Sequence, residues 1–213
     1  DEKYDHSYSS SPRLISDSKL TTIVLRNRKT SPQDIYNLCN MLQNSEFVML
    51  VTLDLSRIHL GLEAMANVLV ASKGCTRLRD IDLSSTNGSA SCPVTKRKNC
   101  NKFGAKVGYA IGNSTTLRSI NISNNTLSTC MLIFTQKLHD TLLLNKKSIL
   151  KVLDVSHNKF SGTKVCTYLG AIAIRLESFV SQGNNLSRNS STSFFNSMNN
   201  ELDKLPSPSS LTY

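Results

Sequence analysis

The sequence predicts an α/β solenoid, a curved stack of repeats with a parallel sheet on the concave side and helices on the convex side. Three observations support this architecture. The pattern LxxLxLxxNxL, with Ile, Val or Phe allowed for Leu, recurs six times in the 213 residues. Between successive matches, the apolar residues are spaced as in an amphipathic helix. Aromatic residues make up only 6% of the chain and Trp is absent, which suits a core of thin aliphatic layers.

Six matches in series define a leucine-rich repeat, whereas a single match would mean nothing. Residues four and six of each match point to the same face of a short strand, so they form the buried layer of a parallel sheet. The Asn at position nine can bond backbone groups where the chain leaves the strand. This Asn is present in the last three matches and replaced in the first three. The matches begin at Leu20, Leu50, Leu78, Leu117, Leu150 and Leu176, and position nine holds Arg28, Ile58, Thr86, Asn125, Asn158 and Asn184.

Each segment between strands predicts a full helix, which is typical of the ribonuclease-inhibitor class of these repeats. Because helices are wider than strands, the stack must curve with its strands inside. The residues Ser31-Pro32-Gln33-Asp34 predict a capped helix start. The apolar stripes are Ile35, Leu38, Cys39 and Leu42; Leu62, Met65, Ala66, Leu69 and Val70; Phe103, Val107, Ala110 and Ile111; Met131, Phe134, Thr135, Leu138 and Leu142; Cys166, Leu169 and Ala173; and Phe194, Phe195, Met198 and Leu202.

Two segments lack the repeat, and one repeat is unusually long. We expect residues 1–18 to be a flexible lead-in, residues 19–203 to form the solenoid, and residues 204–213 to be a linker or tail. The third repeat is 39 residues long, and we expect a basic insertion at residues 89–102. A solenoid needs capping units at both ends, and the first repeat is a poor cap, so we expect the chain to be a piece of a longer protein.

Positions three, five and seven of each match face the concavity. Four of these residues are acidic and one, Arg26, is basic, so the face is polar and mildly acidic although the net charge of the chain is +10. This distribution disfavours nucleic acid in the concavity. We expect the concave face to bind another protein. The candidate residues are Asp54, Asp80, Asp82, Asp154, Ser84 and Asn121.

The basic residues collect elsewhere. Arg79, Arg118 and Lys151 occupy position two of three successive repeats and could neutralise the acidic row beside them. A denser group lies in the long third repeat and is a second candidate surface, for an acidic protein or an anionic lipid, unless it is only a solvated insertion. The candidate residues there are Lys96, Arg97, Lys98 and Lys102, followed by Lys106.

No pattern in the sequence indicates catalysis, a cofactor or a metal site. The four histidines fall in separate segments, and there is no nucleophile elbow, phosphate-binding loop or dinucleotide fingerprint. Six scattered cysteines suggest free thiols in a reducing compartment, with a bridge between Cys92 and Cys100 as the alternative for an exported protein. No apolar run is long enough to cross a bilayer.

The phrases LVTLDLSRIHL, LRDIDLSST, LRSINISNNTL and LKVLDVSHNKF resemble cytoplasmic ribonuclease-inhibitor-type repeats, and NOD-like receptors carry competing repeats of the same class. Within that class, residues 20–187 are similar to CARMIL, the family of actin capping-protein regulators. The resemblance implies a non-enzymatic scaffold in a cytoplasmic protein associated with the cytoskeleton or a membrane. The alternative hypothesis is a basic structural subunit of a large ribonucleoprotein assembly.

Overall fold

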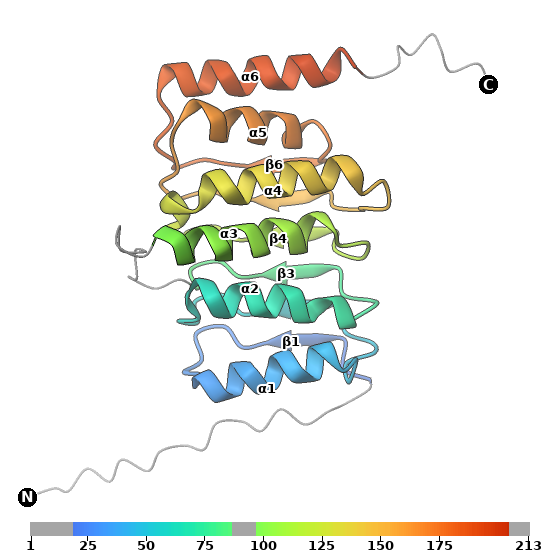
Figure 1. The fold of residues 1–213 in the computed structure, drawn as a ribbon. Helices are drawn as coiled ribbons and strands as arrows, with labels where there is room; N and C mark the ends of the chain where they lie inside the picture. Colours follow the sequence, from blue (N-terminus) through green and yellow to red (C-terminus); the bar gives the residue numbers. More distant parts are fainter. Residues whose placement is uncertain (1–18, 87–96, 205–213) are drawn as a thin grey trace, which may run out of the picture.

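The computed structural model describes residues 19–86 and 97–204, which form one stack of repeats (Figure 1). Six strands alternate with six α-helices, and two single 3-10 turns lie beside α2 and α4. The strands are β1 (Thr22–Val24), β2 (Thr52–Asp54), β3 (Asp80–Asp82), β4 (Ser119–Asn121), β5 (Val152–Asp154) and β6 (Ser178–Val180). The helices are α1 (Pro32–Gln43), α2 (Gly61–Ala71), α3 (Arg97–Gly112), α4 (Met131–Leu144), α5 (Thr163–Ala173) and α6 (Arg188–Leu202).

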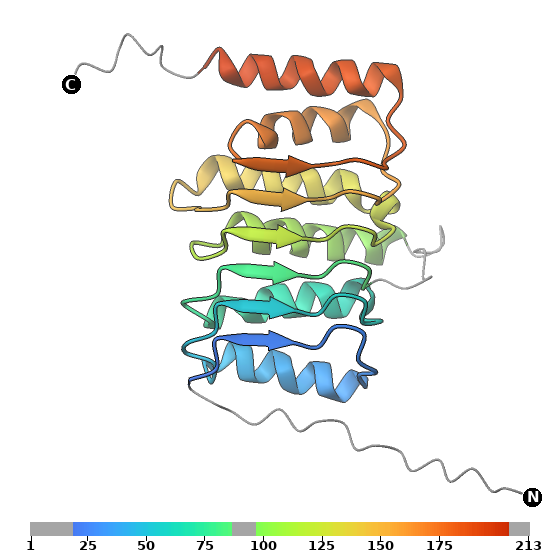
Figure 2. The ribbon, with the colours of Figure 1, turned by 180° about the vertical axis from the view of Figure 1, so that it is seen from behind.

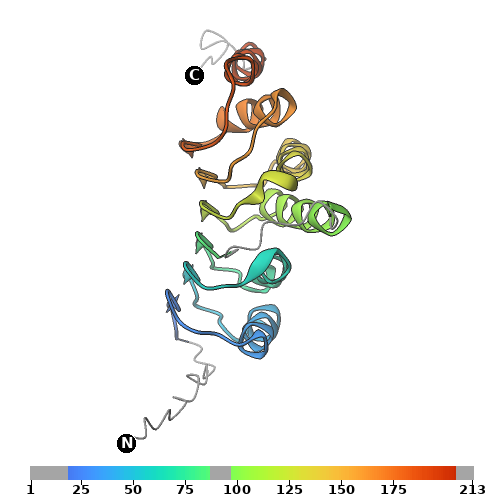
Figure 3. The ribbon, with the colours of Figure 1, turned by 90° about the vertical axis from the view of Figure 1, so that its left-hand side faces the viewer.

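All six strands are parallel, and each pairs with the next strand in the sequence (Figure 2). The register follows the repeat: Ile23 lies beside Leu53, Leu53 beside Ile81, and so on to Phe179. The strands line the inner side of the curve and the helices its outer side (Figure 3). The predicted leucine-rich-repeat solenoid is therefore confirmed.

The core lies between the sheet and the helices and consists of the predicted positions. At position four, Leu53, Ile120 and Leu153 are completely buried, and the helix stripes complete each layer from the other side. Three stripe residues are exceptions. Val70 is 45% exposed because α2 buries Val68 and Ala71 instead, and Phe195 and Leu202 are exposed on the terminal helix.

A ladder of buried asparagines joins the last four repeats at the turn that follows each strand. The Asn158 amide donates to the carbonyl oxygens of Ile122 and Val155, and its side-chain oxygen accepts from the backbone N–H of Asn125. Asn125 repeats this arrangement and accepts from the N–H of Thr86, and Asn184 does so for Asn158. The asparagine side chains thereby bond backbone groups in the turns of neighbouring repeats.

The first two turns are built differently. Ile58 occupies the asparagine position and is buried among apolar side chains, while the N–H groups of Leu60 and Gly61 bond the carbonyl oxygen of Thr86. Arg28, at the same position of the first repeat, is exposed. The Ser31 side chain accepts from the N–H of Asp34, and the Asp34 carboxylate accepts from the N–H of Ser31, which confirms the predicted helix cap.

The helices of the second half approach one another through glycines. A Cβ atom on Gly108 of α3 would collide with the carbonyl oxygen of Phe134 in α4. Gly104 lies as closely against the backbone of Cys130 just before α4, and Gly112 against the side chain of Thr141 in α4. Gly170 of α5 meets Phe194 of α6 equally closely. A side chain at these positions would push the two backbones apart, so the glycines set the spacing of α3–α4 and α5–α6.

The long third repeat differs from the expectation in one respect. Residues 97–102, assigned to the end of the basic insertion, form the first turns of α3. The cause is visible in the spacing: Cys100 is buried one turn ahead of Phe103 and Val107, so the apolar stripe of this helix begins earlier than expected. The predicted segment 1–18, residues 205–213 of the predicted tail, and residues 89–96 of the predicted insertion lie outside the described residues.

Candidate protein-binding surfaces

The concave sheet brings the predicted acidic residues and their small polar neighbours onto one face. Asp80, Asp82 and Asp154 are all half-buried, and strand pairing puts Asp82 of β3 beside Asn121 of β4 and Asp80 beside Ser119. The amide of Asn121 donates to the outer carboxylate oxygen of Asp82 over 3.4 Å. Ser84 follows Asp82 along the chain. This surface consists of short polar groups, so the strand backbone is approachable from the concave side.

The acids at position five also stabilise the turns of the fold, which the sequence pattern did not predict. One carboxylate oxygen of Asp82 accepts from the backbone N–H of Ser84 over 2.8 Å, and Asp154 bonds Ser156 in the same way. Asn121 makes the equivalent bond to the N–H of Ser123. Each side chain closes the turn two residues after it, as Asp and Asn commonly do. The second oxygen of Asp154 remains for an external partner, whereas the second oxygen of Asp82 already accepts from the Asn121 amide.

Asp54 is the exception in the predicted acidic row. It is buried and accepts from the N–H of Ser56 at 2.9 Å and from the Arg26 guanidinium at 2.8 Å. Burial raises the pKa of Asp54, but the hydrogen bonds from Ser56 and the Arg26 charge outweigh it and hold the pKa below its ordinary value. Because Arg26 already neutralises this carboxylate, the free acidic surface reduces to Asp80, Asp82 and Asp154.

The basic residues at position two form a row along one margin of the sheet. Glu177 occupies the equivalent position of the last repeat and pairs with both Lys151 and, at 3.8 Å, Arg118. These cations hold the pKa of the Glu177 carboxyl below its ordinary value, chiefly through the Lys151 hydrogen bond. Arg79 donates instead to the carbonyl oxygen of Thr116. The row is therefore neutralised by Glu177 at one end rather than by the concave acids.

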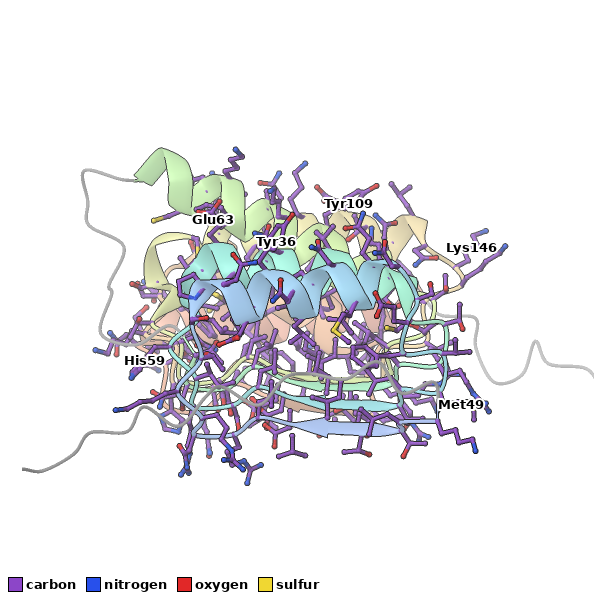
Figure 4. All side chains as sticks on the ribbon, turned by 90° about the horizontal axis from the view of Figure 1, so that it is seen from below. Tyr36, Met49, His59, Glu63, Tyr109 and Lys146 are labelled. Carbon is purple, nitrogen blue, oxygen red and sulfur yellow. The ribbon has the colours of Figure 1, made fainter. Side chains whose placement is uncertain are left out.

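The second candidate surface lies at the start of α3. The backbones of Arg97 and Lys98 belong to this helix, Lys102 and Lys106 are exposed on it, and Lys96 lies outside the described residues. The start of α3 tilts outward from the helix layer (Figure 4). The structure thus places Lys102 and Lys106 on the convex side, well separated from the concave acids.

A groove between α1 and α2 was not predicted from the sequence. It has a volume of about 620 Å³. Tyr36 and Cys39 come from α1, Glu63 and Val70 from α2, and Lys106 from α3. Tyr36 is 60% exposed on the outer side of α1 (Figure 4). The predicted stripe of α2 included Val70, whereas the helix turns Val70 outward and leaves the small Ala64 on the groove wall.

The cysteines have different environments. Cys75 and Cys130 are buried free thiols, and burial raises their pKa values to about 11 and about 12. Cys166 is also buried, and Cys39 is half-buried beside the groove. Cys100 is disulfide-bonded, which corrects the expectation of six free thiols.

The described residues contain no cluster of three His, Cys, Asp or Glu side chains that could hold a metal ion. No helix within residues 19–86 and 97–204 has the length and apolarity to cross a bilayer.

The fold has known counterparts among solved structures, but their sequences are distant. The second actin-binding site of leiomodin-1 is 13% identical, with a TM-score of 0.51, and the alignment covers 82% of this chain and 92% of that one. The tropomodulin C-terminal domain of Caenorhabditis elegans is 12% identical, with a TM-score of 0.47 and coverage of 80% and 94%. No family model matches the sequence, and no curated protein does either. The class of molecule is a leucine-rich-repeat solenoid.

Proposed function

We propose that this chain is a non-catalytic protein-binding module that acts in the assembly of the actin cytoskeleton. The observation that carries the proposal is the concave sheet, which presents Asp80, Asp82 and Asp154 among short polar side chains. The concave side is the largest continuous surface of such a solenoid. The fold shared with the second actin-binding site of leiomodin-1 supports actin as the first partner to test. The resemblance of the repeats to CARMIL points to the same system.

The chemistry of the face suggests the kind of contact. Asp154 uses one oxygen for its own turn and leaves the other for a partner, whereas Asp82 bonds Ser84 with one oxygen and Asn121 with the other. Asp80 makes no ion pair with a described residue. Fixed carboxylates next to small Ser side chains suit a helix or loop that carries Lys or Arg. We place the partner on this face and treat the basic start of α3, with Lys102 and Lys106, as the competing site.

A charge reversal on the sheet tests the proposal. Cosedimentation with actin filaments, and binding to labelled actin monomers, should detect the unmodified chain. The double variant Asp80→Lys with Asp82→Lys is expected to weaken binding at least about tenfold, since reversing close charge pairs costs several kcal/mol. Folding of the variant is checked by circular dichroism.

A control of equal charge change lies on the helix side. Asp140→Lys with Asp203→Lys raises the net charge by the same four units, but away from the concave face. It should leave actin binding unchanged. Equal losses in both double variants, or a loss only on changing Lys102 and Lys106 to Glu, would refute the concave-face assignment. Failure of the unmodified chain to bind either form of actin would refute the choice of partner.

The ribonucleoprotein alternative rests on the net charge of +10. It predicts RNA affinity that falls steeply with salt, with a logarithmic slope of about 0.7 for each phosphate contact. A slope near zero excludes this alternative and leaves the protein-binding proposal intact.

A further inference from the structure

The two edges of the solenoid differ in their exposed apolar side chains. One edge consists of the loops that lead from each helix to the next strand: residues 44–51, 72–79, 113–118, 145–151 and 174–177. Met49 and Lys146 lie on this edge, and His59 lies on the opposite one (Figure 4). We call the first edge the helix-to-strand edge. Its basic residues are Lys73, Arg77, Arg79, Arg118, Lys146, Lys147, Lys151 and Arg175, and its acidic residues are Glu46 and Glu177.

Exposed apolar side chains concentrate where α4 ends. Leu144 is 84% exposed, the most exposed of the large hydrophobic residues in the described chain, and Leu143 and Ile149 are 39% and 37% exposed. Val48, on a loop of the same edge, is 50% exposed. The opposite edge also carries bases, but none of the exposed large hydrophobic residues lies in its described loops. Charge alone therefore does not distinguish the two edges, whereas charge combined with apolar exposure does.

The end of α4 is held in place by Asn145. Its amide donates to the carbonyl oxygens of Gly112 and Ser114, and its side-chain oxygen accepts from the N–H of Lys147. These bonds tie the loop to the preceding repeat. The exposure of Leu144 is consequently a property of an anchored loop rather than of a frayed helix end.

Two lysines next to Leu144 are available for an anion. Lys146 and Lys147 are exposed, and their ammonium groups make no ion pair or hydrogen bond with the described residues. Arg118 and Lys151, farther along the edge, already share Glu177. The unpaired positive charge therefore lies beside the exposed leucine.

We propose that the helix-to-strand edge docks on an anionic phospholipid bilayer, with Leu144 entering the headgroup region and Lys146 and Lys147 contacting lipid phosphates. An apolar tip flanked by lysines matches the interface of a bilayer, which offers hydrocarbon just beneath a negative surface. Nucleic acid would use the lysines but gains nothing from Leu144. The site is separate from the concave face, so the outcome of its test does not depend on the proposed function.

The absence of Trp from the chain allows a direct test on the whole protein. Leu144→Trp introduces a single fluorophore at the tip, and Val24→Trp introduces one at an exposed concave position as the control. Vesicles of phosphatidylcholine with phosphatidylserine should shift the emission of the first variant to shorter wavelength and leave the second unchanged. Vesicles of phosphatidylcholine alone should shift neither.

Vesicle cosedimentation then separates the apolar and electrostatic contributions. Leu144→Ser is expected to weaken binding at least about tenfold, and Lys146→Gln with Lys147→Gln about fivefold for each lysine. The matched control, Lys159→Gln with Lys164→Gln, removes the same charge at the opposite edge and should change little. All of these variants alter exposed side chains.

Three results would overturn the proposal: no binding to the anionic vesicles at low salt, an equal loss from both lysine pairs, or full binding by Leu144→Ser. Binding to soluble RNA that requires Lys146 and Lys147 but not Leu144, without vesicle binding, would assign the edge to nucleic acid instead.

Discussion

The helix pair α3–α4 packs closely, whereas the helix pair α1–α2 leaves a groove between its helices. Glycines let α3 and α4 touch backbone to backbone, with Gly108 against Phe134. Gly61 of α2 makes no such contact; only Gly74, in the 3-10 turn after α2, meets Leu42 of α1, and the groove beside Tyr36 remains. The same repeat can thus close its outer layer or leave it open, depending on a few small residues at helix-facing positions.

The turns after the strands show the same division. From Thr86 onward, buried asparagines link each repeat to the next, whereas the first two repeats use Ile58 and the ion pair of Arg26 with Asp54. The second half of the stack is therefore tied by both helix contacts and an amide ladder. Since a solenoid is stabilised by contacts between neighbouring repeats, we expect the first two repeats to be its weaker part.

The largest effect should come from a charge in the central layer. Leu153→Asp places an unpaired carboxylate where the native side chain is completely buried, which costs several kcal/mol, roughly the stability of a domain. We expect circular dichroism to show loss of the folded signal. The same change at Ile23, in the outermost repeat, should unfold only that end. A folded Leu153→Asp protein would contradict the register of β5.

The next effect tests the contrast between the helix pairs directly. Gly108→Leu forces α3 away from the carbonyl oxygen of Phe134 and should destabilise the fold by about 3 kcal/mol, at the upper end for overpacking. Ala64→Leu adds a larger side chain to the groove wall and should change the unfolding free energy by less than about 1 kcal/mol. Urea unfolding of both variants measures the difference. Similar losses would show that the α1–α2 groove is not an open space.

Breaking the asparagine ladder should lower the unfolding free energy by less than the change at Gly108. Asn158→Ala removes the donor to Ile122 and Val155 and the acceptor of the Asn125 N–H, so we expect a loss of about 2 kcal/mol. Arg28→Ala, at the equivalent exposed position of the first repeat, should stay within about 0.5 kcal/mol. Amide hydrogen exchange in the turns should rise around Asn125 in the first variant only. If exchange is unaltered there, the ladder is not what ties the repeats together.

The sequence predicted the layers of this fold because each depends on residue spacing alone. Strand positions such as Leu53 and Leu153, and the cap at Ser31, follow from periodicity and local chemistry. The α3–α4 contact could not be predicted in this way, because Gly104, Gly108 and Gly112 gain their meaning from a partner helix. The neutralisation of Asp54 could not be predicted either, because its partner Arg26 lies in the neighbouring repeat.

The smallest effect concerns the ion pair that joins β1 and β2 at the weaker end. Asp54 has a pKa below its ordinary value in the folded chain, so its ionised form contributes stability at neutral pH. This contribution is present above the pKa of an unfolded Asp and disappears as the pH falls through the lower, folded value. Because Arg26 is half exposed and screened by water, we expect less than about 1 kcal/mol.

Asp54→Asn keeps the shape and the acceptor for the Ser56 N–H but removes the charge. Urea unfolding at pH 7 should therefore show a small loss for Asp54→Asn, and the loss should vanish in acid, where Asp54 is protonated in both states. Asp154→Asn is the matched control in the second half, since Asp154 makes the same turn bond without an arginine partner. A loss that persists at low pH would mean that shape rather than charge matters at Asp54. Equal pH dependence in the two variants would remove this distinction between the halves of the stack.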